Sequence, residues 1–473
     1  MAGEKRSTQV AVVGGGPGGY AAAFRAADLG LRVTLVDPEP NPGGVCLYRG
    51  CIPSKAYLHV ARLLRETRMA GEWGVHFAEP RVDVERLRAW KDEVVAKLTG
   101  GLGQLCKTRG VEHIRGRAVL LGTNLLRIDR VEPPNLELEF EHAILATGSR
   151  PSAPPALHIE TPRVLTSTDA LALQDVPGTL LVVGGGYIGL EMGTFYAELG
   201  TRVTVVEMTG ALLPGVDPDL VRVLAGSLEN RLHDVRLETS VESLVDEGSS
   251  VHAVLISKNA REELDFDKVL VAVGRKPNST GLGLDGTRIE VDERGFVKVD
   301  ASRRTGEPTI YAIGDLTGEP MLAHKATHEG ITAAEAIAGR RASFEPRAIP
   351  AVVFTDPEIA WCGLTESAAK RGGIEVSTAR FPWQASGRAA TLGRGEGITK
   401  LVLDPQTDRV LGVGICGPGA GELIAEGVLA VEMGAAAADL AATIHPHPTL
   451  SETLMEAAEV FYGQSVHFAR RRR

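Results

Sequence analysis

A chain of 473 residues is too long for one hydrophobic core, so we expect three or four domains of roughly 100–200 residues each. Hydrophobic residues make up 44% and charged residues 23%, which is ordinary for a soluble globular protein. The net charge of −9 argues against nucleic-acid binding through a broad basic surface, and no apolar stretch reaches the roughly 18 residues of a membrane span. The one basic run, Arg470–Arg473, is predicted to be a solvated chain end.

Cysteine usage indicates the compartment. Five cysteines in a chain of this length do not form a disulfide scaffold, and their odd number leaves at least one thiol free. A reducing, cytoplasmic setting is therefore the expectation. In that setting a disulfide is usually catalytic or transient.

The first predicted element is a β-strand that ends in a glycine-rich turn. Residues 9–19 read QVAVVGGGPGG, a helix-like segment follows to residue 30, and a second strand, LRVTLVD, ends at Asp37. In such a unit the glycines give a tight turn, close approach to a pyrophosphate and helix–strand packing, and the terminal acid accepts from a ribose. Asp37 also suits a turn in DPEPNPG, so both roles stay open for it.

Residues 43–55, GGVCLYRGCIPSK, hold two cysteines five positions apart. Metal binding is disfavoured because the other cysteines are scattered and His59 is the only nearby histidine. In a regular helix the Cα atoms of Cys46 and Cys51 would be about 8–9 Å apart. A disulfide needs about 7 Å or less, so pairing excludes a smooth helix there. Pro53 suits the first turn of a following helix, which places Cys51 near the N-terminus of that helix. The helix dipole there, and the positive charge of Lys55 one turn further on, would both stabilise a Cys51 thiolate.

The first unit is repeated further along the chain. Residues 179–189 read TLLVVGGGYIG, a helix-like segment follows, and the strand TRVTVVE ends at Glu207. The spacing from Gly14 to Asp37 equals that from Gly184 to Glu207, so we predict two dinucleotide sites. Glu207 would repel a 2′-phosphate and no basic residue follows it closely, which favours NAD over NADP at the second site.

Three later segments resemble strand ends, and the pattern of the sequence changes after them. HAILATGSRP at 142–151 and KVLVAVGRKP at 268–277 both place a glycine and a basic-Pro pair after an apolar strand, where a domain crossover is plausible. Residues 307–330 predict a strand ending at Gly314-Asp315 and then a helix. After Pro350, alternating strands and alanine-rich helices predict a mixed α+β domain.

Taken together, GGVCLYRGCIPSK, the two fingerprints, ATG at 146–148, Gly314-Asp315 and HPHPTLSE at 445–452 resemble the pyridine nucleotide–disulfide oxidoreductase family over essentially the whole chain. The resemblance implies a glutathione-reductase-like α/β fold with two Rossmann-like dinucleotide-binding domains and a C-terminal α+β dimerisation domain. It also implies FAD in the first site, NAD in the second and a homodimer. The expected domains are FAD-binding (1–150), NAD-binding (151–280), a central domain completing the FAD site (281–350) and the interface domain (351–473).

The resemblance also implies which residues bind the cofactors. For FAD these are Gly14, Gly16, Gly19, Asp37, Gly44, Lys55, Ala118, Gly148, Asp315 and Ala323. For NAD they are Gly184, Gly186, Tyr187, Gly189, Glu207, Val241 and Gly274. Tyr187 could shield the flavin until nicotinamide displaces it, or could simply pack.

Within the family, the motifs are most similar to those of the branch that oxidises dihydrolipoamide with NAD. The resemblance then implies that Cys46 exchanges with substrate, that Cys51 lies nearer the flavin, and that Lys55 pairs with Glu191. His447, oriented by Glu452, would be the base and would act across the dimer interface; His445 is the competing candidate. The lipoyl group would arrive on a partner protein of a 2-oxoacid dehydrogenase or glycine-cleavage complex.

Two alternatives to this activity remain. One is another disulfide reductase of the same family: Glu207 and HPTLSE disfavour glutathione reductase, and the absence of a terminal Cys pair disfavours mercuric reductase. The other is a catalytically silent flavoprotein, which retention of the predicted catalytic residues argues against. Tyr48, Arg49 and Pro446 depart from the usual family pattern. The roles of Cys106, Cys362 and Cys416 are left unassigned.

Overall fold

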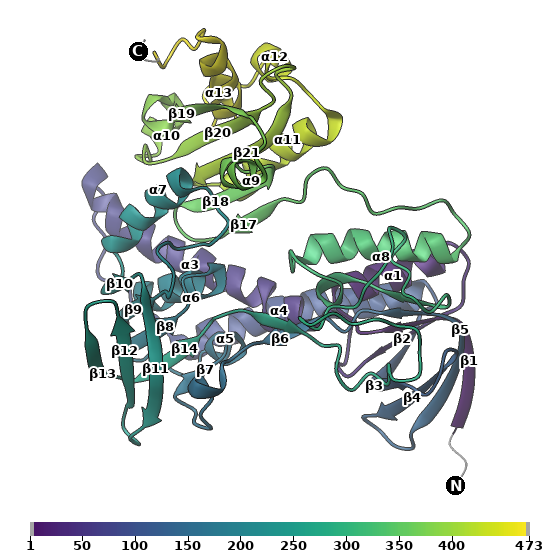
Figure 1. The fold of residues 1–473 in the computed structure, drawn as a ribbon. Helices are drawn as coiled ribbons and strands as arrows, with labels where there is room; N and C mark the ends of the chain where they lie inside the picture. The colour runs from purple at the N-terminus through teal and green to yellow at the C-terminus, as the bar shows by residue number, and fades with distance from the viewer. Residues whose placement is uncertain (1–3, 470–473) are drawn as a thin grey trace.

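The first α/β unit is built on a parallel sheet in the strand order β3-β2-β1-β5-β16 (Figure 1). The structure, a computed structural model, describes residues 4–469, so the predicted Arg470–Arg473 tail lies outside it. Val10, Ala11 and Val12 of the central strand are completely buried, as expected for a parallel sheet with both faces covered. The antiparallel strand β4 bridges β3 and β5. The strands are β1 (Glu4–Val13), β2 (Val33–Asp37), β3 (Glu112–Leu120), β4 (Leu125–Arg130), β5 (Leu136–Leu145) and β16 (Ile310–Ala312).

Helices cover this sheet and extend away from it. Helix α1 packs against α8, which follows β16 and so returns the chain to the first unit. Two long helices, α3 and α4, run from this unit towards the second one (Figure 1). The bounds are α1 (Pro17–Asp28), α2 (Gly44–Arg49), α3 (Cys51–Met69), α4 (Val84–Thr108) and α8 (Ala323–Ile337), with short 3₁₀ turns η1 (Ala70–Trp73) and η3 (Gly314–Leu316).

The second unit repeats the first, as the sequence predicts. Its parallel sheet has the order β10-β9-β8-β14-β7 and carries the antiparallel sheet β11-β12-β13. The strands are β7 (Val164–Leu165), β8 (Thr179–Val183), β9 (Arg202–Val206), β10 (Asp234–Arg236), β11 (Thr239–Asp246), β12 (Val251–Ser257), β13 (Arg261–Phe266) and β14 (Lys268–Val271). The helical segments are η2 (Pro155–Leu157), α5 (Ser167–Ala172), α6 (Tyr187–Glu198) and α7 (Pro218–Glu229).

The two crossovers between these units pair with each other. Strand β6 (Ser149–Pro151) runs antiparallel to β15 (Arg275–Pro277), so the two segments with a basic-Pro pair lie side by side. The crossover interpretation of these segments is therefore confirmed.

The C-terminal unit is an antiparallel sheet in the order β17-β18-β21-β20-β19, packed against α11 and α13. In Figure 1 it lies above α7 and is reached by a long extended segment that follows α8. The strands are β17 (Ala351–Val353), β18 (Glu358–Gly363), β19 (Ser377–Pro382), β20 (Ile398–Leu403) and β21 (Val410–Gly417). The helical segments are α9 (Glu366–Gly372), η4 (Trp383–Ala385), α10 (Gly387–Thr391), α11 (Ala420–Met433), α12 (Ala437–Ala442) and α13 (Glu452–Tyr462).

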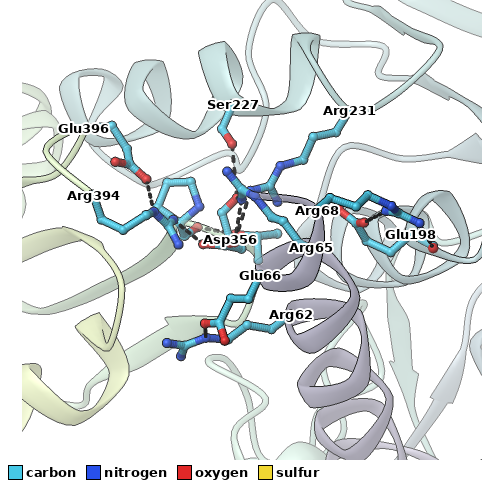
Figure 2. A network of polar contacts seen from close by, with 12 residues as sticks. Arg62, Arg65, Glu66, Arg68, Glu198, Ser227, Arg231, Asp356, Arg394 and Glu396 are labelled. Atoms are coloured by element: carbon cyan, nitrogen blue, oxygen red, sulfur yellow. Dashed lines mark hydrogen bonds and ion pairs between the residues drawn. The ribbon is translucent and has the colours of Figure 1, made fainter. Parts of the chain in front are cut away.

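One carboxylate joins all three units. Asp356, in the loop between β17 and β18, forms ion pairs with Arg65 of α3, Arg231 next to α7 and Arg394 of its own unit (Figure 2). The side chains of Arg231 and Arg394 are 9% and 8% exposed. Because a buried charge is costly unless it is paired, this contact fixes the position of the C-terminal unit on the other two.

Along residues 4–469, no helix is both long and apolar enough to cross a membrane.

Candidate active site

A cavity of about 740 Å³ opens at the carboxyl ends of the first sheet. All ten residues predicted to bind FAD line it, together with Cys46, Cys51, Tyr187 and Glu191. These residues come from α1, β2, α2, α3, β3, α6, η3 and α8 and from the loops beside them, which are distant in sequence. The fold thus brings the predicted FAD residues and the predicted redox residues into one cavity.

The glycines of the first fingerprint shape a cradle at the start of α1. A Cβ atom on Gly14 would lie 2.3 Å from the carbonyl oxygen of Ala146, and one on Gly19 would lie 1.8 Å from that of Gly14. Beside Gly16, in contrast, there is open space within 4 Å. A helix N-terminus with free backbone amides and room beside it attracts phosphate groups, so this part of the cavity fits a pyrophosphate.

The acids that end the second strand of each unit lie in the same local geometry. Asp37 accepts from the amides of Gly15 (2.6 Å) and Glu39 (2.9 Å). Glu207 accepts from Gly185 (2.7 Å) and Thr209 (2.8 Å). Burial raises the pKa of Asp37, and the two amides act against that rise. Each carboxylate thus accepts hydrogen bonds within its own turn and retains lone pairs that could accept further ones. The turn role of Asp37 is therefore present in the structure, and its ribose role stays a prediction.

The two cysteines lie on either side of a break between helices. Helix α2 ends at Arg49, Gly50 has φ −143° and ψ −108°, and α3 begins at Cys51. The segment is therefore not a regular helix, which is the condition that pairing of the two cysteines would require. Neither cysteine forms a disulfide in this structure, and in the thiol form a hydrogen bond between their side chains has the largest influence on the pKa of each.

This hydrogen bond makes the two thiols unequal. The hydrogen bond from Cys46, helped by the positive charge of Lys55, lowers the pKa of Cys51 to about 7. The same hydrogen bond, together with burial, raises the pKa of Cys46. In the dithiol state the negative charge therefore belongs on Cys51, at the start of α3, where the helix dipole also favours an anion.

Lys55 and Glu191 form the pair that the sequence predicts. The ammonium nitrogen of Lys55 lies 2.8 Å from Oε2 of Glu191, a side chain that is 3% exposed. The other carboxylate oxygen of Glu191 accepts from the backbone amide of Phe354 at 2.9 Å. Phe354 lies in the C-terminal unit and was missed from the sequence, where nothing marks an aromatic residue in VVFTDPE as part of this site.

Ser149 and Arg275 were also not predicted from the sequence. Ser149 contacts Asp315, and Arg275 contacts Ser149. The hydroxyl of Ser149 donates to Oδ2 of Asp315 at 2.5 Å, and Arg275 donates to the hydroxyl and the carbonyl of Ser149 at 2.7 and 2.8 Å. Both residues belong to the paired strands β6 and β15. Their repeated Gly-basic-Pro pattern was the available indication. They fix Asp315 on the cavity wall, where Ala323 begins α8.

The second fingerprint lies largely outside this cavity. Tyr187, the first residue of α6, is 40% exposed and lines the cavity together with Cys51 and Asp315. Gly184, Gly186 and Gly189 form a turn like that of the first unit, in which a Cβ on Gly189 would lie 2.3 Å from the carbonyl oxygen of Gly184. Val241 is in β11 and Gly274 precedes β15, so their predicted contacts with NAD stay predictions.

The two candidate histidines differ in what their rings contact. Nδ1 of His447 lies 2.8 Å from Oε1 of Glu452, and Nε2 has no partner among the hydrogen bonds of the described residues. Both nitrogens of His445 are engaged, with the carbonyl of Thr443 (2.9 Å) and with Glu426 (2.8 Å). The side chain of His447 is 68% exposed and that of His445 is 5% exposed. This geometry favours His447 as the ring that can exchange a proton.

Glu452 is held as an anion beside His447. Burial opposes its ionisation, but the amide of Thr449 at 2.7 Å and the His447 ring outweigh burial and lower the pKa of Glu452. His447 does not line the cavity that contains the cysteines of its own chain. A single chain thus brings together every predicted catalytic residue except His447 and Glu452.

Two residues of the cysteine stretch have local roles. The hydroxyl of Tyr48 donates to the carbonyl of Asn41 at 3.0 Å, and Arg49 forms an ion pair with Glu39. Tyr48 does not line the cavity. Across residues 4–469, no group of three or more His, Cys, Asp or Glu side chains could hold a metal ion.

Comparison with known proteins places this fold and site in a class. Residues 8–330 match the pyridine nucleotide-disulphide oxidoreductase family, and residues 349–458 match the dimerisation domain of that family. The chain therefore belongs to the pyridine nucleotide-disulphide oxidoreductases and carries their dimerisation domain.

Individual relatives narrow the comparison. The chain is 46% identical to dihydrolipoyl dehydrogenase of Vibrio cholerae over 456 residues and 48% identical to that of Haemophilus influenzae over 457 residues. These alignments cover 96% of this chain, and 96% and 95% of the relatives. The crystal structure of LpdA from Mycobacterium tuberculosis superposes with a TM-score of 0.89 at 29% identity, covering 96% of this chain and 99% of that one. RclA from Escherichia coli, an HOCl-induced flavoprotein disulfide reductase, superposes with a TM-score of 0.85 at 29% identity, covering 96% and 99%.

FAD and NAD are the cofactors of this family, and the residues fit them. The open space beside Gly16 at the start of α1 suits the pyrophosphate of FAD, and the cavity continues from there to Lys55 and the cysteines. The repeated turn at Gly184–Gly189 and Glu207 suits NAD.

Proposed function

We propose that this protein oxidises dihydrolipoyl groups, carried by a partner protein, to lipoyl groups with NAD as the electron acceptor. The observation that carries the proposal is that Cys46 and Cys51, on either side of the helix break at Gly50, line the same cavity as the residues predicted to bind FAD. The relatives named dihydrolipoyl dehydrogenase, which are alike over nearly the whole chain, support this choice of substrate.

In the proposed reaction the two cysteines exchange a disulfide with the substrate dithiol. A substrate thiolate attacks Sγ of Cys46, the Cys46–Cys51 bond breaks, and Cys51 leaves as a thiolate. The second substrate sulfur, as a thiolate, then attacks the substrate sulfur of the mixed disulfide, and Cys46 leaves. The substrate is oxidised to the cyclic disulfide and the protein disulfide is reduced to the dithiol. The lowered pKa of Cys51 suits it as the leaving group and as the sulfur that retains the charge.

His447 is the proposed base for this exchange. Thiols have a pKa of about 8.5 and must lose a proton before they attack, which a neutral imidazole can accept near pH 7. Glu452 orients the ring through Nδ1 and stabilises the imidazolium that forms, so that Nε2 faces the substrate. The imidazolium releases this first proton to water, so that neutral His447 can accept the proton of the second substrate thiol. It returns that second proton to the sulfur of Cys46 when Cys46 leaves. We place His447 of one subunit at the cysteines of the other, which its exposure supports.

Bound FAD supplies the two-electron relay between the dithiol and NAD. The glycines of the first fingerprint, Asp37 and Asp315 would hold FAD, and the Lys55–Glu191 pair would lie beside its reactive ring. The second fingerprint and Glu207 would hold NAD, with Tyr187 between the two sites. Glu207 would disfavour NADP because it repels a 2′-phosphate.

The working protein is proposed to be a homodimer, because residues 349–458 match a dimerisation domain and because His447 is separated from the cysteines of its own chain. The lipoyl group is proposed to be carried by a 2-oxoacid dehydrogenase or glycine-cleavage partner. A cytoplasmic location is part of the proposal and rests on the small and odd number of cysteines.

A steady-state panel tests this function. Purified holoenzyme is assayed with lipoamide, glutathione disulfide and inorganic oxidants such as Cu(II), each with NADH and with NADPH. We expect lipoamide with NADH to give the highest kcat/KM by at least about ten-fold. A preference for another disulfide or for Cu(II) would instead assign the chain to another reductase of its family, such as one resembling RclA.

A further inference from the structure

The loop between β17 and β18 belongs to the C-terminal unit but contacts the redox helix α3 and the neighbouring helix α6. This loop holds Phe354 and Asp356, and both reach α3, the helix that begins at Cys51. Phe354 contacts the Lys55–Glu191 pair, and Asp356 forms an ion pair with Arg65 (Figure 2). Lys55 and Arg65 are about 15 Å apart along a regular helix, so the loop braces α3 at two places.

Phe354 contacts both members of the ion pair at once. Its backbone amide donates to Oε1 of Glu191 at 2.9 Å, and its ring centroid lies 4.5 Å from the ammonium nitrogen of Lys55. A cation over an aromatic face within about 6 Å is attracted to it, and the attraction is stronger where water is partly excluded. The Lys55 side chain is 31% exposed and that of Glu191 is 3% exposed, so the pair itself is largely enclosed.

The position of Lys55 matters because the positive charge of Lys55 and the negative charge of Glu191 act on the ionisation of Cys51 in opposite directions. Lys55 stabilises the Cys51 thiolate and Glu191 destabilises it. A flexible lysine that leaves the pair would change this balance, and its four-carbon stem gives it several rotamers to leave by. The aromatic ring restricts that freedom.

We propose that Phe354 is a positioning residue: its ring holds the Lys55 ammonium, and its amide holds the Glu191 carboxylate, in a fixed arrangement beside Cys51. The C-terminal unit thereby sets the electrostatics of a thiol that belongs to the FAD-binding unit. The proposal builds on the role of Cys51 in the proposed function, but not on which disulfide is the substrate.

The test uses the Cys46→Ser holoenzyme, in which Cys51 is the one remaining thiol of the pair. A Cys51 thiolate against oxidised flavin gives a long-wavelength absorption band, so the band follows the ionisation of Cys51 as pH changes. The titratable groups that face Cys51, apart from Cys46, are Lys55 on α3, Tyr20 on α1, and Tyr187 and Glu191 on α6.

In this background, Phe354→Leu keeps the amide and removes the ring. We expect the midpoint of the band to rise by about half a pH unit, a change of about three-fold in the ionisation constant, because Lys55 then lies less often beside the thiolate. Phe354→Tyr retains an aromatic face and should restore the original midpoint. Phe344→Leu is the matched control, since Phe344 lies under another cation, Arg303, at 5.0 Å.

The proposal is overturned if Phe354→Leu titrates like its parent, or if Phe344→Leu shifts the band as far. It is also overturned if Phe354→Leu lowers thermal stability without moving the band. The outcome does not depend on the substrate panel. A protein that fails to reduce lipoamide can still show the shift in the midpoint of the band, and a protein that oxidises dihydrolipoyl groups can lack it.

Discussion

The contact between His447 and Glu452 gives a sharp test of the proposed base. Changing Glu452 to Gln keeps the size of the side chain and removes its charge. Oε1 of Glu452 lies 2.8 Å from Nδ1 of His447, and Oε2 accepts from the Thr449 amide. Glutamine can still accept from one of these donors, but it cannot stabilise a positive imidazolium by charge.

The size of the effect follows from exposure. Two unit charges about 4 Å apart interact by about 1 kcal/mol in water and about 4 kcal/mol at an effective dielectric of 20. In the single chain the Glu452 side chain is 17% exposed and that of His447 is 68% exposed. The proposed partner subunit would cover part of the His447 ring, which puts the interaction energy of the pair above the value in water and below the value at an effective dielectric of about 20. We therefore expect a loss of about 1–2 kcal/mol, or about 5- to 30-fold in kcat for dihydrolipoamide oxidation. Since the pKa of Glu452 is lowered, the loss should persist across neutral and alkaline pH.

The chain supplies its own control for this change. His445 and Glu426 make the same kind of contact, with Nε2 and Oε1 2.8 Å apart, but are not proposed to act in the reaction. Glu426→Gln should leave dihydrolipoamide oxidation within about two-fold of the unchanged protein. NADH oxidation by an artificial dye, which needs no thiol base, should be unaffected in both variants. Equal losses in the two variants, or less than a two-fold loss for Glu452→Gln, would refute the assignment of His447.

Three further predictions concern the thiols and the loop at Asp356. Cys46→Ser should abolish dihydrolipoamide oxidation and leave NADH-to-dye transfer intact; retained lipoamide turnover would show that Cys46 is not the exchanging sulfur. In the two-electron-reduced protein, the Cys51 thiolate should be present above about pH 7 and lost below it, because the hydrogen bond from Cys46 and the charge of Lys55 lower its pKa; an absorbance midpoint above pH 9 would contradict this. Asp356→Ala should lower the free energy of unfolding by about 3 kcal/mol in chemical denaturation, since it leaves the buried Arg231 without its carboxylate and Arg394 with Glu396 alone. Arg62→Ala, which breaks a pair whose side chains are 50% and 47% exposed, should cost less than about 0.5 kcal/mol, and equal losses would show that burial of the Asp356 network adds nothing.

Local pattern was sufficient to predict the FAD side of the site. Glycine fingerprints, strand ends and the break at Gly50 depend on backbone conformations that few residues allow, so they are readable from short stretches. The predicted FAD residues accordingly line one cavity, and α3 begins at Cys51. The roles of individual residues towards FAD and NAD remain predictions.

Contacts between site residues from distant segments could not be predicted from such short sequence patterns. Ser149 and Arg275 meet only because β6 pairs with β15, and Phe354 reaches Lys55 only because the C-terminal unit packs on α3 and α7. Such contacts depend on how whole units are placed, and no periodicity or spacing near Phe354 records that placement.

The choice between His445 and His447 shows the same division. Both lie in HPHPTLSE, so the sequence by itself determined that an imidazole and a carboxylate would be near each other at the C-terminal end. Only the tertiary structure decided that both ring nitrogens of His445 are occupied by Thr443 and Glu426, whereas His447 keeps one nitrogen free among the described contacts. The physical reason is that hydrogen-bond partners are set by packing in three dimensions, while sequence spacing sets only which groups share a turn.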